Sequence, residues 1–367
     1  MSKAVDEITV RAPARVNLIG EHTDYNGGYV LPAAISLEIT ARGRLRNDEK
    51  VSVRAEDIGH SAEFDLNDIR FDREHPWLNY IQGVAFFLIK AGFSLKGVDM
   101  SVRGNIPRGA GLSSSAALEV ASALVFQGLS GFEFTPVETA KLCQKAENEF
   151  VGMRCGIMDQ FACCLGRENS AVFLDCRTLD FSHVPLDDDI RIVICNTGVR
   201  RELASSEYNM RRAECEKAAG LLGVPDLSRV SAGELEEKAG SLPEVLLKRA
   251  GHVVSENGRV LKAVEALKGG RFGELKELFS SSHASLRDDF EVSCPELDLM
   301  VRLASEVRGV FGARMTGAGF GGCAVSLVRA ESVDEFLEAV PGKYRLQTGI
   351  EPEIYVCRAV GGAGIID

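Results

Sequence analysis

The sequence predicts a chain of two domains with a mixed fold, α/β or α+β, and three observations support this prediction. Segments rich in β-branched residues alternate along the chain with segments of helical periodicity. The length of 367 residues exceeds what one hydrophobic core usually supports, so two domains are expected. Three aspartates at 187–189 lie where two segments of similar size meet, and they mark a boundary between lobes at 1–188 and 189–367.

The individual elements follow from short apolar patterns, taken here in chain order. Strand-like, β-branched runs occupy 8–12, 28–35, 51–55, 98–103, 171–175, 190–195, 323–329 and 353–357. Apolar residues three and four positions apart predict helices at 78–91, 116–129, 136–150, 205–222, 243–267, 272–286, 295–307 and 332–340. The sequence has no repeat of solenoid length, so a stacked-repeat architecture is not expected.

The charge and hydropathy of the chain exclude several kinds of partner. A formal net charge of −11, from 42 Lys and Arg against 53 Asp and Glu, lacks the basic footprint that nucleic acids and anionic membranes require. No apolar run has the length of a bilayer, and residues 1–15 contain no continuous apolar signal core. The ten cysteines form no CxxC pair, as is typical of small buried side chains in a reducing compartment. We therefore expect a cytoplasmic protein that binds neither nucleic acid nor membrane.

Residues 11–32 gather many hydrogen-bonding side chains in one loop. An apolar run at 16–19 ends at Gly20, a polar stretch follows, and the chain turns at 26–28. Ordering and desolvating so many polar groups costs more free energy than exposed ion pairs return. Such groups could clamp a polyhydroxy ligand through charge-assisted hydrogen bonds, and an ion-paired hairpin turn is the alternative. The polar residues in question are Arg15, Glu21, His22, Thr23, Asp24 and Tyr25.

A second stretch, PRGAGLSSSAA at 107–117, runs directly into an expected helix. Small residues let the backbone wrap an oxyanion closely, serines add donors, and the helix presents free N–H groups. The stretch lacks the lysine of a Walker A loop and the glycine spacing of a dinucleotide-binding loop. It is typical of a phosphate cradle, with a serine-rich cap on a buried helix as the alternative.

Two acidic residues occupy apolar surroundings. Glu147 shares a helical face with positions 140, 143 and 150, and a carboxylate on an apolar stripe needs a cation. Magnesium or a buried arginine would supply it. Asp159 lies among large apolar residues at 155–161, where a guanidinium such as that of Arg15 would keep it ionised and able to accept a proton. A cap on a helix or turn is the alternative for Asp159.

Three motifs in this order resemble the GHMP small-molecule kinases. They are the acidic loop, the serine-rich stretch at 107–117 and the glycine-rich TGAGFGG at 316–322. Within that family, RVNLIGEHTDYNGG at 15–28 is specific to the galactokinases. The resemblance continues through GIMDQF at 156–161, the segments 200–212 and 283–298, and the glycine-rich tail at 361–364. It therefore spans almost the whole chain.

The resemblance implies a fold and an activity. The GHMP kinase fold has an N-terminal lobe like ribosomal protein S5 and a ferredoxin-like C-terminal lobe, with the active site in the cleft between them. Whether the final strand returns to the N-terminal lobe stays open. The implied reaction is the phosphorylation of the anomeric hydroxyl of galactose by ATP and Mg²⁺, in a monomer or weak dimer whose partners are the sugar and ATP. Alternatives are a kinase for N-acetylgalactosamine, galacturonate or arabinose, and a non-catalytic sugar sensor.

The resemblance also implies a role for individual residues. The catalytic residues would be Asp159, as acid/base, and Arg15, which stabilises its charge and that of the moving phosphoryl group. The sugar-binding residues would be Glu21, His22, Thr23, Asp24, Gly156 and Tyr208. The ATP phosphates would lie on Gly109, Ala110, Gly111, Leu112, Ser113, Ser114 and Ser115, with Mg²⁺ on Ser115 and Glu147. Trp77 resembles the family segment near adenine, with core packing as the alternative. Alanine stands at 14, 110 and 318, where the family more often has glycine.

Overall fold

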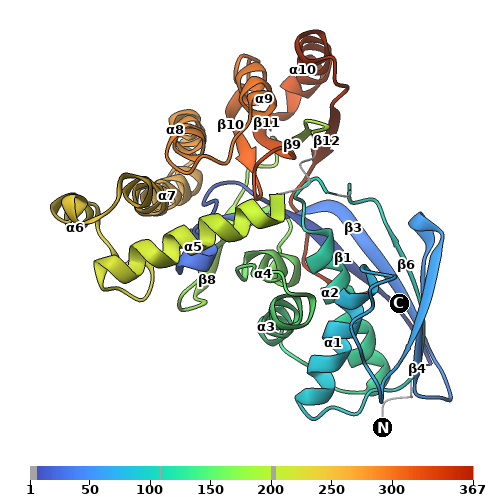
Figure 1. Cartoon of the computed structure of the whole chain (residues 1–367). Helices are drawn as coiled ribbons and strands as arrows, with labels where there is room; N and C mark the ends of the chain where they lie inside the picture. The colour runs from blue at the N-terminus through green and yellow to red at the C-terminus, as the bar shows by residue number, and fades with distance from the viewer. Residues whose placement is uncertain (1–5, 108, 200–203, 367) are drawn as a thin grey trace.

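A long antiparallel ribbon runs through the first lobe of the computed structural model, which describes residues 6–107, 109–199 and 204–366 (Figure 1). Its strands are β1 (Glu7–Asn17) and β3 (Pro32–Leu45), which pair along their length. The register shifts between Pro13 and Ala14. A bulge of this kind bends a strand and redirects the side chains beyond it, and the next residue along β1 is Arg15.

The ribbon forms the centre of a six-stranded sheet with the order β13-β1-β3-β6-β4-β5. The other members are β4 (Lys50–Ala55), β5 (His60–Asp65), β6 (Val98–Gly104) and β13 (Gly364–Ile365). Only β4 and β6 run parallel among the described pairs of this sheet. Because β13 pairs with β1, the last described strand returns to the sheet of the first lobe.

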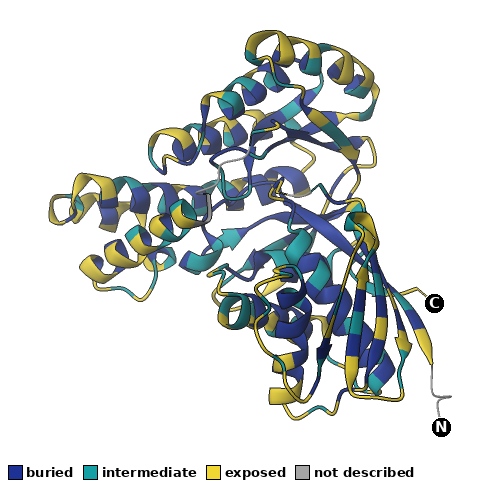
Figure 2. Cartoon of the chain, turned by 45° about the vertical axis from the view of Figure 1, so that its right-hand side comes forward, coloured by how far each residue is buried: buried dark blue, intermediate teal, exposed yellow. Residues whose placement is uncertain are grey.

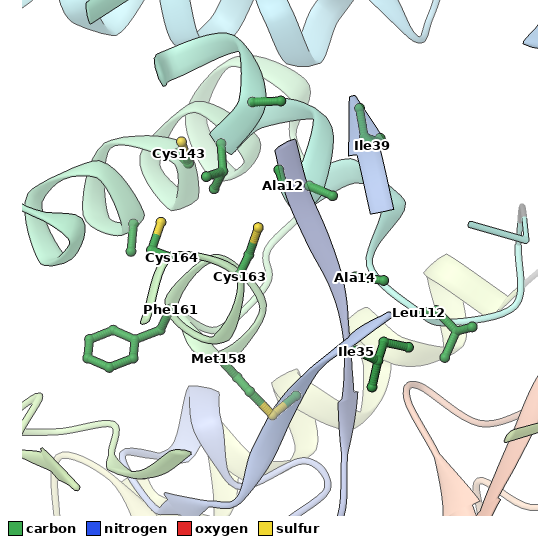
Figure 3. Close-up of a cluster of buried hydrophobic side chains, with 14 of the residues drawn as sticks. Ala12, Ala14, Ile35, Ile39, Leu112, Cys143, Met158, Phe161, Cys163 and Cys164 are labelled. Carbon is green, nitrogen blue, oxygen red and sulfur yellow. The ribbon is translucent and has the colours of Figure 1, made fainter. Parts of the chain in front are cut away.

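Four helices cover one face of this sheet (Figure 1). They are α1 (Leu78–Lys90), α2 (Ser114–Ser130), α3 (Pro136–Ala146) and α4 (Met158–Leu165). Helices α2 and α4 pack directly on β1 and β3, and α1 and α3 pack against those two helices. Buried side chains are concentrated where helices and sheet meet (Figure 2). In the core shown in Figure 3, Ala12 and Ala14 of β1 are small and fully buried, which lets the helices approach the strand closely.

A small antiparallel sheet leads to the second lobe. It contains β2 (Tyr29–Val30), β7 (Ser170–Asp175) and β8 (Phe181–Pro185). The second lobe has an antiparallel sheet with the order β10-β11-β9-β12. Its strands are β9 (Ile190–Asn196), β10 (Val310–Thr316), β11 (Cys323–Arg329) and β12 (Glu353–Cys357).

The helices of the second lobe form two groups (Figure 1). Helices α8 (Leu275–Asp288) and α9 (Pro295–Ser305) pack on β10, and α10 (Val333–Thr348) packs on α9 and β12. The other group contains α5 (Ala204–Leu222), α6 (Ala232–Glu237) and α7 (Glu244–Lys268). Helix α7 also contacts α8 and the small sheet, so it links the two lobes. No helix in the described ranges has the length and hydropathy needed to cross a membrane.

The elements differ from the predicted ones in several places. Strands β5, β8, β10 and β13 and helices α4 and α6 were not predicted, and β3 continues ten residues beyond the predicted end at 35, to Leu45. The predicted helix at 136–150 ends as an α-helix at Ala146 and continues as a π-helical turn, Glu147–Val151. Helix α10 passes through Pro341, where the prediction stopped. All ten cysteines are free, as expected.

Candidate active site

The predicted catalytic, sugar and phosphate residues meet around one cavity of about 330 Å³. Its walls come from the end of β1 and the loop that follows, the N-termini of α2 and α4, the π-helical turn, α5 and the glycine-rich loop after β10. The predicted residues that line it are Arg15, Glu21, His22, Asp24, Gly109, Gly111, Leu112, Ser113, Ser114, Ser115, Glu147, Asp159 and Tyr208. Arg108 and residues 200–203, which belong to two of the motifs, lie outside the described residues.

The predicted contact between Arg15 and Asp159 is present. Arg15 Nε and Nη2 donate to the two carboxylate oxygens of Asp159 at 2.7 and 2.8 Å, and Nη1 donates to the Gly111 carbonyl at 2.7 Å. Burial lowers the pKa of Arg15, but the attraction of Asp159 outweighs this effect, and the pKa is raised. Because Asp159 lies in the first turn of α4, the pair fixes this helix relative to β1 and to the serine-rich loop at 109–115, called the phosphate loop below after its predicted role.

The Glu21 carboxylate is buried at the far end of the cavity, with 1% of the residue exposed. One oxygen accepts the Gly317 N–H at 2.6 Å and lies 3.5 Å from the Arg314 guanidinium, and the other accepts a hydrogen bond from the Asn17 amide. A carboxylate has about four acceptor positions. The protein therefore orients Glu21 and leaves acceptor capacity for ligand hydroxyls.

His22 is a neutral wall of the cavity. Burial, followed by the positive charge of neighbouring groups, lowers its pKa to about 3. Its Nε2 lies 3.2 Å from the Ala318 carbonyl, which can only accept, so Nε2 carries the proton. Its Nδ1 then accepts from the Tyr25 hydroxyl at 2.8 Å. Tyr208 completes this wall, since its ring centre lies 5.6 Å from that of His22 and 5.5 Å from that of Tyr25.

Asp24 carries a carboxyl group that titrates near neutral pH. Burial and the nearby charge of Asp159 raise its pKa from 3.8 to about 7. Gly156 packs directly against this carboxyl, because a Cβ built on Gly156 would overlap the Asp24 side chain. Gly156 does not itself line the cavity among the described residues, so its contribution is the space it leaves for Asp24.

Thr23 and Ala110 stand apart from the predicted binding sets. The Thr23 hydroxyl lies 2.8 Å from the Gly20 carbonyl and 2.7 Å from the Tyr29 carbonyl, so it faces the inside of its own loop. Ala110 is buried, and it faces the glycine-rich loop at 316–322 rather than the main cavity. Both residues shape the loops that carry the other predicted residues.

The phosphate loop adopts an unusual backbone conformation. Gly109, Gly111 and Ser113 have φ values of +69°, +73° and +60°. Such values are strained for serine and are maintained at functional sites. The Ser113 hydroxyl donates to Asp159 instead of capping α2, so the first N–H groups of α2 have no cap from this side chain. The N-terminus of α2 is therefore available to an anion in the cavity.

Glu147 and Ser115 form a pair of oxygen donors beside the phosphate loop. Ser115 and Glu147 line the same cavity, and burial and the charge of Asp159 raise the pKa of Glu147. A carboxylate and a hydroxyl next to a phosphate site suit Mg²⁺, which takes one or two protein oxygens and completes its shell with phosphate and water. Among the described residues, no group of three or more His, Cys, Asp and Glu could hold a metal alone.

Two residues behind Glu147 were not predicted. The Gln160 amide donates to Glu147 at 2.6 Å and to Glu119 at 3.0 Å. Glu119 is fully buried, and burial followed by the charge of Glu147 raises its pKa well above the usual value. A signal was available for Glu119, because it is the one charged residue in the apolar helix that follows the serines.

A second cavity of about 460 Å³ opens on the other side of the same serines. Ser114 and Ser115 line both cavities, and Trp77 and Tyr80 line the second one. The Trp77 Nε1 is buried and has no hydrogen-bond partner among the described residues. The segment that contains Trp77, which was expected near adenine, thus lies next to the phosphate loop.

Known families match most of this architecture. The model of the GHMP kinases N-terminal domain matches residues 79–167, the galactokinase galactose-binding signature matches 2–44, and the GHMP kinases C-terminal model matches 263–346. Curated galactokinases from Roseiflexus sp. (strain RS-1) and Chloroflexus aurantiacus are each 46% identical over 97% of this chain and 92% of their own length.

Solved structures agree with these matches. Lactococcus lactis galactokinase complexed with galactose has a TM-score of 0.94 and 40% identity, over 98% of this chain and 95% of that one. Mevalonate kinase from L. major, at 18% identity and a TM-score of 0.68 over 98% of this chain and 99% of that one, shares the fold. The predicted two-lobed α+β fold class is therefore confirmed.

Proposed function

The chain belongs to the galactokinase family of the GHMP kinases, and from this premise we propose that the cavity transfers the γ-phosphate of ATP to the anomeric hydroxyl of galactose. The products are galactose 1-phosphate and ADP. One observation carries the assignment of the site. Asp159, held by Arg15, lines one cavity with the serine-rich loop and with the loop at 18–28 that follows β1, which we call the sugar loop. Phosphoryl transfer depends on this kind of alignment and charge compensation.

In this proposal Asp159 accepts the proton of the anomeric hydroxyl as the hydroxyl oxygen attacks phosphorus. Arg15 holds both carboxylate oxygens of Asp159, so the base has one orientation and its charge is compensated. A positioned base of this kind contributes about 10²- to 10⁴-fold in rate. Ser113, which donates to the same carboxylate, ties the base to the loop that would hold the phosphates.

The phosphates would lie on the backbone of residues 109–115 and the N-terminus of α2. The glycine conformations and the helix N-terminus suit a bound oxyanion. Ser115 and Glu147 would hold Mg²⁺, which neutralises charge on the phosphates when bound. The cavity lined by Trp77 and Tyr80 would take the nucleotide base, because an aromatic wall and a free indole N–H suit a heterocycle.

The sugar would contact Glu21, Asp24 and Tyr208, with the neutral ring of His22 as a wall.

We keep the lobe boundary at 188/189 as a proposal, supported by the strands, since β1 to β8 and β9 to β12 belong to different sheets. A cytoplasmic location is supported by the ten free cysteines. A monomer or weak dimer stays the proposed state.

A coupled assay of ADP release tests the proposed function. The purified chain is given Mg-ATP with galactose, N-acetylgalactosamine, glucose or arabinose. We expect galactose to give the highest kcat/KM, because hydrogen-bonded sites discriminate strongly against a missing or displaced hydroxyl. Preference for another sugar of the panel would overturn the substrate assignment. Absence of turnover with every sugar would favour a sugar sensor on this scaffold.

A further inference from the structure

A buried charged network lies behind the sugar loop, on the side away from the cavity. Arg314 of β10 and Glu256 of α7 are each fully buried. Burying charged groups costs several kcal/mol per ion unless other groups compensate them. Neither residue lines the cavity in the described part of the chain, and the proposed reaction does not use them. Their cost to folding therefore needs another explanation.

Arg314 reaches the sugar loop at two points. Its Nη1 donates to the Leu18 carbonyl at 3.3 Å and lies 3.5 Å from the Glu21 carboxylate. Its Nε donates to the Ser282 hydroxyl at 3.1 Å, which holds the guanidinium plane from the second lobe. The planar guanidinium thus reaches the turn between Leu18 and Glu21 with one nitrogen while its other nitrogens face Ser282 and Glu256, and a single ammonium group could not serve all these partners at once.

Glu256 supports both Arg314 and the loop. One of its carboxylate oxygens accepts the Gly20 N–H at 3.0 Å and the Ser282 hydroxyl at 2.6 Å, and lies 3.8 Å from Arg314. His252, one turn earlier on α7, lies with Nε2 3.1 Å from the Glu21 carbonyl. Three loop positions, 18, 20 and 21, are therefore held by side chains of α7 and β10.

We propose that Arg314 is a specificity-determining positioning residue, which, supported by Glu256, fixes the Glu21 carboxylate toward one hydroxyl of the sugar. The inference rests on the proposed function, and it names the residue that keeps the sugar-selecting carboxylate in place. The substrate would contact Glu21 but not Arg314, which does not line the cavity and acts through Glu21. A carboxylate held within a fraction of an ångström discriminates a missing hydroxyl, and one that can rotate does not.

The test is Arg314→Lys, which keeps the charge and removes the fork. Galactose and its monodeoxy analogues are titrated calorimetrically without nucleotide, so binding is measured apart from phosphoryl transfer. Glu21→Gln first identifies the hydroxyl that Glu21 binds. The analogue that lacks this hydroxyl binds more weakly than galactose to the unmodified protein but about as well as galactose to Glu21→Gln. We expect Arg314→Lys to weaken galactose binding about 10-fold or more and to reduce discrimination at that hydroxyl from about 30-fold to about 3-fold. The ratios for the other hydroxyls and the KM for Mg-ATP should stay within about twofold.

Arg249→Lys is the matched control. Arg249 is equally buried in the second lobe and pairs with Glu214 and Glu291, away from the sugar loop. It should lower the Tm without changing discrimination between sugars. Glu256→Gln is a second variant, and it should weaken discrimination at the same hydroxyl as Arg314→Lys.

The results that would overturn the inference also show whether the proposed function fails with it. If Arg314→Lys binds galactose normally, or loses affinity equally for every analogue, the residue is structural and only this inference fails. If the unmodified protein does not bind galactose, the proposed function fails as well. Turnover by the unmodified protein with unchanged discrimination in Arg314→Lys would leave the proposed function intact and contradict the positioning role.

Discussion

Asp159 and Arg15 form the contact on which the proposed chemistry depends. Asp159→Asn keeps an oxygen that accepts from Arg15 and removes the proton acceptor. We expect kcat to fall by at least about 10²-fold while galactose affinity changes little. Single-turnover rates and calorimetric binding check this prediction. Asp99→Asn is the control, because Asp99 also pairs with an arginine, Arg46, but lies exposed on β6 and does not line the cavity. Near-normal turnover of a folded Asp159→Asn variant would contradict the assignment of the base.

Asp24 should make sugar binding depend on pH. Its pKa of about 7, raised mainly by burial, means that the carboxylate, the better acceptor for hydroxyls, is lost as pH falls below 7. We expect the dissociation constant for galactose to rise between pH 8 and pH 5.5 in the unmodified protein. Asp24→Asn should bind weakly at both values. A flat profile for the unmodified protein would contradict the prediction.

The same group affects stability in the opposite direction. The folded pKa lies above the unfolded value of 3.8, so the neutral form stabilises the fold below that value, and this contribution is lost as pH rises through 7. Asp24→Asn should therefore be more stable than the unmodified protein at pH 8, by about 1 to 2 kcal/mol, and equal to it near pH 4. Denaturant unfolding at the two pH values measures the difference.

At the residue scale, the sequence predicts the side chains that line the cavity better than the side chains behind them. The contact of Arg15 with Asp159 was predicted because an acid among apolar residues needs a cation. Arg314 and Glu256 were not predicted, because their partners lie in distant segments that share no periodic pattern. The alanines at 14, 110 and 318 are not among the described residues with positive φ, so their methyl groups cause no backbone strain.

Among the elements, the phosphate loop is the one whose backbone shape carries most of the proposed function. Gly111→Ala places a Cβ at φ +73°, and the nearest atoms lie 3.9 Å away, so the change is conformational rather than steric. We expect the KM for ATP to rise several-fold and the galactose affinity to stay unchanged. Alanine is about 1 kcal/mol less stable than glycine at positive φ, so the variant loop leaves this conformation more often. Steady-state kinetics and calorimetry measure both quantities.

Gly349→Ala is the control for the loop variant. Gly349 has φ +74° at the end of α10, with open space around it. It should lose similar stability with no change in the KM for ATP. If both variants change that KM equally, the loop conformation has no special connection with the nucleotide.

Element prediction failed where the local pattern was weak or interrupted. Strand β10 contains Gly312 and the buried Arg314, so neither apolar alternation nor an apolar run is visible in it. Helix α4 has eight residues, too few for a clear period. The π-helical turn at Glu147–Val151 cannot be distinguished by apolar spacing from the α-helix that precedes it. Both α4 and this turn carry site residues.

For the whole molecule, the cavity draws on both lobes, and its occupation should stabilise them together. Galactose at 100 times its dissociation constant should raise the free energy of unfolding by about 2.7 kcal/mol. A thermal shift with galactose but not with glucose at equal concentration checks this. An equal shift with both sugars would indicate a nonspecific solvent effect.

The two-lobed fold class could be predicted because alternation and length are global properties of the sequence. The return of the final strand to the first lobe was raised by the family resemblance but left open, because the two residues of β13 carry no recognisable pattern. The meeting of α7 and β10 behind the sugar loop is likewise a product of tertiary packing.

The packing of α7 and β10 behind the sugar loop has a consequence for recombination among relatives. The loop proposed to select the sugar is encoded near the start of the chain, whereas the side chains that hold it, His252, Glu256 and Arg314, are encoded in the later half. A chimera that joins the early half of one kinase to the late half of another inherits its ligand groups from one parent and their rigidity from the other. Sugar preference in such hybrids should depend on whether the loop from one parent fits the residues at 252, 256 and 314 from the other, and not on the origin of the loop alone.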